Sequence, residues 1–121
     1  KGENYGWKIL GWGGTNYSGS KIGPKWKPGF TKAIKYWVPS IATSAITIYK
    51  GSEFKEWNGL ALVTSLKDKS LRAIDFSDLS NVKENVIFKD KIGRLRDIQV
   101  HPENGKIYFL AGNFLWLMEK N

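Results

Sequence analysis

The stretch "GRLRDIQVHPENGKIYF", residues 93–109, decides the fold of this chain. Two runs rich in Ile, Val and aromatic residues, "LRDIQV" and "KIYF", flank the dipeptide Asn104-Gly105, which is a strong signal for a tight β-hairpin. The connection "HPENGK" is too short for the crossover helix that joins parallel strands. The stretch therefore predicts two antiparallel strands that are neighbours in one sheet.

Short runs of the same kind recur from Ala45 onward, separated by turn residues: "AITIY", "GLALVTSL", "SLRAIDF", "NVIF" and "NFLWLM". In "GLALVTSL" and "KIYFLAGNFLWLM" apolar residues occupy both faces of the strand, so both faces need cover. Small antiparallel sheets stacked face to face are typical of a β-propeller, and a β-sandwich is the alternative. Seven strands make about two four-stranded blades. Helical periodicity is missing, and the best helix candidate, from Ser77 to Lys83, is a single turn.

The composition describes one ordinary folded chain of 121 residues, 41% of them hydrophobic. We expect a Gly- and aromatic-rich loop region over residues 1–35 and the blade strands over residues 36–121. The chain has no cysteine, so it has neither disulfides nor a thiolate metal site. No apolar run approaches the roughly 18 residues of a membrane span. The chain opens on Lys1 without a signal peptide, as expected of a piece of a longer protein.

The net charge of +8 and the six tryptophans suit proteins that bind single-stranded nucleic acid with basic grooves and stacking aromatics. The lysines, however, are scattered along the chain, and the aromatic residues fall in Gly-rich turns or in strands that need cover on both faces. We therefore expect no nucleic-acid partner.

Two arginines open the strand "LRDIQV". Strict alternation places Arg94, Arg96 and Ile98 on one face and Leu95 on the other. Guanidinium groups beside core residues need anions, and their planar forks suit carboxylates. A carboxylated ligand at the mouth of the strand would account for both arginines.

The alternative for these arginines is that both side chains extend to solvent or pair with nearby acids such as Glu84 or Asp90. Lys67, which follows the strand "GLALVTSL", is open to the same two interpretations: a point charge for an anion, or a solvated turn lysine.

Groups for other chemistry are few. His101 is the only histidine and has no partner at the spacing of a catalytic triad or a metal site, so we expect no catalytic role for it. Asp75 and Asp78 are separated by a turn and make no calcium loop. No metal ligands are predicted.

The order of the segments carries more information than any one of them. "NYGW", "NYSG", "YWVPSIATSAITIYKG", "LALVTSLKDKSLRAIDF" and "GRLRDIQVHPENGKIYFL" together resemble the C-terminal part of the glucose/sorbosone dehydrogenase family, over nearly the whole chain. The resemblance implies a soluble sugar dehydrogenase that uses pyrroloquinoline quinone (PQQ). It also implies a six-bladed β-propeller and a periplasmic or secreted location.

The resemblance also implies roles for particular residues. Lys67, Arg94 and Arg96 match positions that hold the carboxylates and the quinone face of the cofactor. Ser40 matches a small hydroxyl residue beside the cofactor, and Trp37 lies in the adjoining cofactor-lining segment. The family's catalytic histidine and calcium ligands belong to earlier blades, so the resemblance implies no catalytic residue here, and calcium only in the full-length family member.

The chain departs from the family pattern at three positions near these segments: Lys8, Thr43 and Ala45. Two hypotheses follow. In the first, the chain is the C-terminal portion of a PQQ-dependent aldose dehydrogenase, inactive alone, whose partners in the intact enzyme are the sugar, the quinone and the remaining blades. In the second, it is a degenerate propeller fragment that serves as a carbohydrate- or protein-binding or assembly module without catalysis, through self-association among other contacts.

Overall fold

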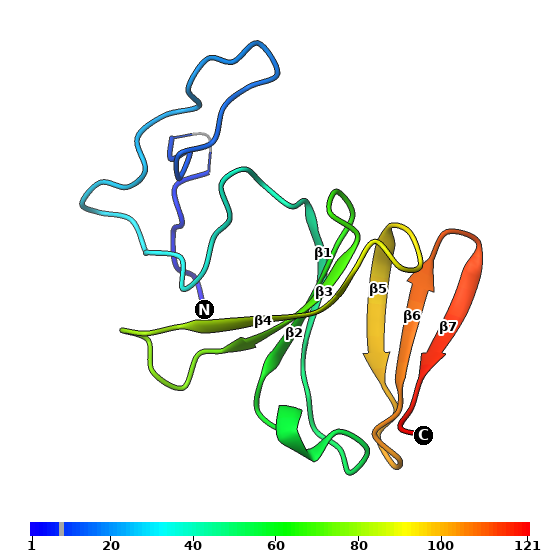
Figure 1. Ribbon diagram of the computed structural model, residues 1–121. Helices are drawn as coiled ribbons and strands as arrows, with labels where there is room; N and C mark the ends of the chain where they lie inside the picture. Colours follow the sequence, from blue (N-terminus) through cyan, green and yellow to red (C-terminus); the bar gives the residue numbers. More distant parts are fainter. Residues whose placement is uncertain (8) are drawn as a thin grey trace. The chain divides into compact units, whose positions relative to one another are not determined.

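The computed structural model describes residues 1–7 and 9–121 and divides into two compact units, Lys1–Ser40 and Ile41–Asn121 (Figure 1). The departure at Lys8 lies outside the described residues. The first unit consists of turns and loops, with one isolated antiparallel bridge between Thr15 and Lys21. None of the helices in the described part of the chain has the length and hydropathy of a membrane-spanning segment.

The second unit contains two antiparallel sheets (Figure 1). The first has four strands in chain order: β1 (Thr43–Ile48), β2 (Ala61–Ser65), β3 (Ser70–Asp75) and β4 (Lys83–Lys89). The second has three: β5 (Leu95–Val100), β6 (Ile107–Ala111) and β7 (Phe114–Met118). Each strand pairs with the next one along the chain, so both sheets are meanders, as predicted. The all-β prediction is confirmed, although the second sheet has three strands and not four.

The prediction of a single helical turn between Ser77 and Lys83 is wrong. Residues 76–82 form bends and turns, in which Asp75 accepts a hydrogen bond from the Ser77 backbone N–H at 3.0 Å. Asp78 accepts one from Ser80 in the same way at 2.9 Å. Such local side-chain acceptors compete with helical hydrogen bonds and favour turns. The short helical element is instead the 3₁₀ turn η1 (Lys55–Trp57).

A buried core joins the two sheets and is closed by the β5–β6 hairpin. Tyr49 is fully buried, donates its hydroxyl hydrogen to the Gly105 carbonyl at 2.8 Å and accepts the Phe54 N–H at 3.0 Å. Gly105 has a φ of +72°, and a Cβ there would lie 2.8 Å from the Tyr49 hydroxyl oxygen. The residue predicted from turn chemistry is therefore also required by packing.

The two strands predicted to need cover on both faces differ in the structure. All five residues of β2 are buried, which confirms the prediction for "GLALVTSL". In β7 four consecutive residues remain between 39% and 68% exposed: Phe114, Leu115, Trp116 and Leu117. Because consecutive residues of a strand point to opposite faces, both faces of β7 are open to solvent within the described chain.

Candidate functional site

The backbone segments that carry three of the cations singled out in the sequence lie at the same end of the two sheets. At the start of β1, the Ile41 carbonyl accepts the Lys67 N–H at 3.0 Å. A few residues on, the Ser44 hydroxyl donates to the Leu95 carbonyl at 2.7 Å. The β2–β3 turn and the start of β5 therefore flank the first residues of β1 (Figure 1). We call this region, which carries Lys67, Arg94 and Arg96, the cationic end.

Arg94 and Arg96, which we call the arginine pair, are both exposed. A β-bulge interrupts the regular alternation of side chains along β5. Leu95 pairs with Ala111, whereas Asp97 pairs with Leu110, so Arg96 is the extra residue on β5. As a result Leu95 and Ile98 are both buried in one core cluster, at 0% and 2% exposure. The predicted placement of Leu95 on the face opposite Ile98 is wrong, because strict alternation does not survive a bulge.

The pairing of these arginines with Glu84 or Asp90, which the sequence left open, is also wrong. Glu84 pairs with Arg72, and Asp90 pairs with Lys69 at 2.9 Å. Of the charged groups in the described residues, none forms an ion pair with either member of the arginine pair. Arg94 and Arg96 are both exposed, so in this chain by itself the two arginines extend to solvent, which was the other possibility that the sequence left open.

Asp97, the acid that follows Arg96, forms its hydrogen bond with the backbone. Asp97 accepts a hydrogen bond from the backbone N–H of Ile98 at 2.8 Å, next to the bulge. The Asp97 carboxylate is thus bonded to the backbone of its own strand, next to the extra residue Arg96. The arginine pair thus retains its donors for a ligand.

Sequence reasoning missed Ser44, which fixes the backbone between the two arginines. Its hydroxyl donates to the carbonyl of Leu95, the residue between them, and also lies 2.9 Å from the buried hydroxyl of Thr64 on β2. Ser44 lies between the departures Thr43 and Ala45, at an irregularity in the β1–β2 register. The "ATSA" segment, residues 42–45, therefore ties β1 to β5 through the serine that lies between the two departures.

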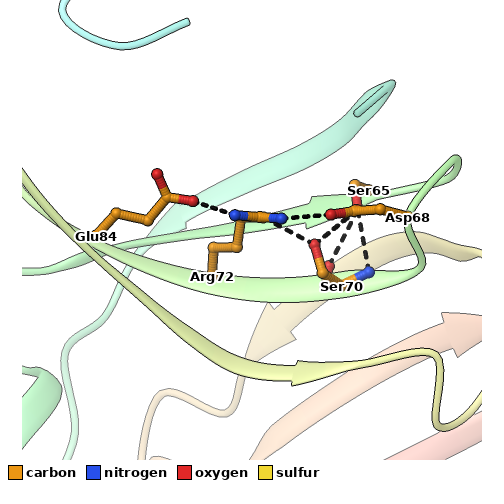
Figure 2. A network of polar contacts seen from close by, with 5 residues as sticks. All are labelled: Ser65, Asp68, Ser70, Arg72 and Glu84. Atoms are coloured by element: carbon orange, nitrogen blue, oxygen red, sulfur yellow. Dashed lines mark hydrogen bonds and ion pairs between the residues drawn. The ribbon is translucent and has the colours of Figure 1, made fainter. Parts of the chain in front are cut away.

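A polar network holds the turn that carries Lys67 (Figure 2). Arg72 on β3 forms ion pairs with Asp68 in the turn and with Glu84 on β4, and its Nε donates to the Ser70 hydroxyl at 3.0 Å. Asp68 accepts further hydrogen bonds from Ser65 and Ser70. The three charged side chains are only 13% to 17% exposed. Figure 2 shows them in a row across the hairpin, with Arg72 in the middle.

The network lowers the pKa of Asp68. Burial alone would raise it, but the hydrogen bonds from Ser65, Arg72 and Ser70 outweigh burial and lower the pKa of Asp68 from 3.8 to about 2. Asp68 is therefore ionised throughout the physiological range, as its pairing with Arg72 requires.

This shift makes the stability of the fold sensitive to acid. Because the folded-state pKa of Asp68 lies below its unfolded value, its contribution is fully present above about pH 4 and is lost as the pH falls towards about 2. We expect protonation of Asp68 to lower the free energy of unfolding by about 2 kcal/mol over that range. Urea unfolding at a series of pH values measures it. In Asp68→Asn the same acid range should show a flatter dependence, and an unchanged slope would contradict the assignment.

Trp37 and Ser40, the other two predicted cofactor residues, lie in the first unit. Trp37 is half-buried, with the Lys35 ammonium 5.6 Å from the centre of its ring, and Ser40 is exposed. Their roles beside a cofactor stay predictions.

His101 has a structural role in the hairpin turn. Its Nδ1 accepts the Glu103 N–H at 3.3 Å, and its backbone carbonyl accepts the Gly105 N–H at 3.0 Å. In residues 1–7 and 9–121 no cluster of three His, Cys, Asp or Glu side chains has the geometry to hold a metal ion.

Antiparallel meander sheets of this kind are the blades of a β-propeller, so the fold defines the chain as a segment of a β-propeller protein. The model of the glucose/sorbosone dehydrogenase family matches residues 1–114, and the chain belongs to this family.

Among curated relatives, the chain is 33% identical over 115 residues to the aldose sugar dehydrogenase YliI of Escherichia coli strain K12. That match covers 92% of the chain and 30% of the relative. The chain is 29% identical over 113 residues to the uncharacterized protein slr1608 of Synechocystis sp.. That match covers 92% of the chain and 27% of the relative.

Two solved structures agree. A glucose dehydrogenase crystal structure matches with a TM-score of 0.83 at 28% identity, covering 99% of the chain and 35% of that protein. The soluble aldose sugar dehydrogenase of Escherichia coli in its apo-form matches with a TM-score of 0.82 at 31% identity, covering 99% and 36%. The chain thus spans about a third of the length of its relatives.

Proposed function

We propose that this chain forms the cofactor-holding portion of a PQQ-dependent aldose dehydrogenase, with Lys67 and the arginine pair as the groups that bind the carboxylates of the quinone. Trp37 and Ser40 are proposed to line the same cofactor, on the family resemblance alone. The rest of the enzyme, including the base that acts on the sugar, would come from the remaining blades.

The observation that carries the proposal is the state of the arginines. The chain has three arginines, and Arg72 has two acid partners, whereas Arg94 and Arg96 have none in the described residues. Two exposed guanidinium groups, with a lysine at the same end of the sheets, make a set of donors that fits a planar molecule carrying several carboxylates. The ammonium group of Lys67 and the guanidinium groups of Arg94 and Arg96 suit a ligand with several separate carboxylates better than one small anion.

When bound, the quinone would supply the redox chemistry, accepting two electrons and a proton from the sugar as hydride. This chain's own residues would bind, orient and polarise it. The bulge at Arg96 and the Ser44 hydrogen bond to Leu95 would hold the arginine pair in a fixed backbone frame. The network around Asp68 would do the same for the turn that carries Lys67.

Titration of PQQ into the full chain, followed by isothermal calorimetry and by the absorbance of the quinone, tests the proposal. We expect saturable binding that weakens as salt is added, because the cationic end is exposed and its charges are screened by ions. Binding that does not respond to salt would show that these cations do not hold the cofactor.

A second candidate function, an assembly module, is favoured by β7. Its four exposed apolar residues and its unpaired edge are a surface that a folded protein normally covers. We expect the isolated chain to self-associate, and sedimentation equilibrium measures this. Leu115→Lys with Leu117→Lys, which places charge on the strand, should shift the chain to monomer. An unchanged mass distribution would show that β7 is not the contact.

A further inference from the structure

A cleft of about 330 Å³ lies at the end of the four-stranded sheet opposite the cationic end. The turn with Lys67 adjoins the first β1–β2 pair, Thr43 with Ser65, whereas the cleft adjoins the last β3–β4 pair, Asp75 with Lys83. Ala73 pairs with Asn85 on the next rung of the same face and leaves the floor of the cleft hollow, because its side chain is one methyl group. This volume is at the lower end of the range for small-molecule sites.

An aromatic ring in a fixed orientation lines one side of this cleft. Trp57 is half-buried on η1 and stacks on Phe54, with ring centroids 4.5 Å apart and 14° between the planes. Tyr49 meets it edge-on at 6.2 Å. Phe54 stacks on the indole and Tyr49 meets it edge-on, so the two neighbours fix the orientation of the ring that lines the cleft. A flat apolar surface held by two neighbours loses little entropy when a ligand packs on it.

Hydrogen-bond donors and hydrogen-bond acceptors line the same cleft as the ring. Glu56 and Asp75 supply carboxylates, Asn85 an amide and Lys83 an ammonium group. The pKa of Asp75 is lowered by its hydrogen bonds from Ser77, so its carboxylate is ionised at neutral pH and acts as an acceptor.

Two of the three acids that line this cleft already have cationic partners within the chain. Glu56 pairs with Lys120 at 3.1 Å, Glu84 pairs with Arg72, and the Lys83 ammonium adds a positive charge at the rim. A strongly cationic ligand would compete with these internal partners. A neutral ligand with several hydroxyl groups, each able to donate and to accept, uses the same groups without displacing them.

We propose that this cleft is a binding site for a neutral carbohydrate, with one sugar ring stacked on Trp57 and its hydroxyl groups bonded to Asp75, Lys83 and Asn85. The apolar C–H face of a sugar ring matches the indole, and its hydroxyl rim matches the mixed donors and acceptors. The site lies at the other end of the sheet from Lys67, so it needs no quinone and is separate from the proposed cofactor function.

The test is binding of D-glucose and cellobiose to the full chain without quinone, measured by saturation-transfer NMR and calorimetry. We expect saturable binding that falls about tenfold in Trp57→Ala, as loss of an aromatic contact of about 1.4 kcal/mol would give. Trp57→Phe keeps a ring on Phe54 and should retain most of the affinity. Near-UV circular dichroism reports whether each variant is folded, and Asn85→Ala, at an exposed position, gives a second test that does not touch the core.

Two control variants show whether sugar binding depends on this cleft. Trp116→Ala removes an exposed tryptophan outside the cleft, and Lys91→Gln removes an exposed positive charge outside it, so both should leave sugar binding unchanged. Asp75→Asn keeps an acceptor for Ser77 but removes the charge, and should weaken sugar binding only a few-fold. The proposal is overturned if neither sugar binds saturably, if Trp57→Ala and Trp116→Ala bind equally, or if spermidine binds in preference to sugar and Asp75→Asn abolishes that binding.

Discussion

Replacing Arg72 by alanine is expected to lower the free energy of unfolding by about 3 kcal/mol or more, the largest stability effect that the fold predicts for one polar residue. The change removes the Arg72 guanidinium from the carboxylates of Asp68 and Glu84, which are mostly buried, at 13% and 17% exposure. It also removes the donor to the Ser70 hydroxyl. Urea unfolding followed by tryptophan fluorescence measures the loss.

A matched control is available in the same hairpin. Lys69 and Asp90 form an ion pair at 2.9 Å, but their side chains are 40% and 67% exposed. Lys69→Ala should therefore cost less than about 1 kcal/mol. Similar losses for the two variants would mean that the Arg72 network is no stronger than a surface pair.

The cost of Arg72→Ala should come mainly from the buried carboxylates that lose the guanidinium, and less from the net gain of the ion pairs themselves. Arg72→Met combined with Asp68→Asn and Glu84→Gln replaces the buried charges by neutral groups of similar size. We expect this triple variant to recover most of the stability lost in Arg72→Ala.

The strands were predictable because their signals are local. Short runs rich in β-branched, other aliphatic and aromatic residues, separated by turn residues such as Asn104-Gly105, define each of the seven strands within a few residues. Short connections then force a meander. The three-stranded second sheet was not predictable, because a repeat of seven runs does not say where one sheet ends and the next begins.

The candidate site was only partly predictable, because two bulges decide which side chains share a face. On β5 the extra residue Arg96 brings Leu95 to the core. On β4 the register shifts between the pair Leu71–Phe88 and the pair Arg72–Val86. Glu84 lies two residues from Val86, so its side chain is on the same face as that of Arg72. Without that shift Glu84 would lie on the opposite face. No local pattern in "SLKDKSLR" or "KENVIFK" reports such a shift.

The second large effect concerns the cofactor. In the double variant Arg94→Gln with Arg96→Gln, the affinity for PQQ is expected to fall at least about a hundredfold, because each charge-assisted hydrogen bond contributes about 1.5 kcal/mol at the lower end of its range. The lower end applies because both side chains are exposed in the chain alone. Glutamine keeps a planar polar end and removes only the charge and the fork. Calorimetric titration of PQQ into the wild-type and variant chains measures the ratio.

Lys91→Gln is the matched control, since it removes one exposed positive charge three residues before Arg94 without touching the cationic end. If the arginines act through direct contact, the double variant loses both affinity and most of the salt dependence, whereas Lys91→Gln changes each only slightly. If they act only through the overall positive charge of the chain, each removed cation lowers affinity by a similar factor, and the loss in the double variant is that factor squared. That second result would remove the arginine pair from the proposed cofactor site, while the membership of the chain in its family would stand.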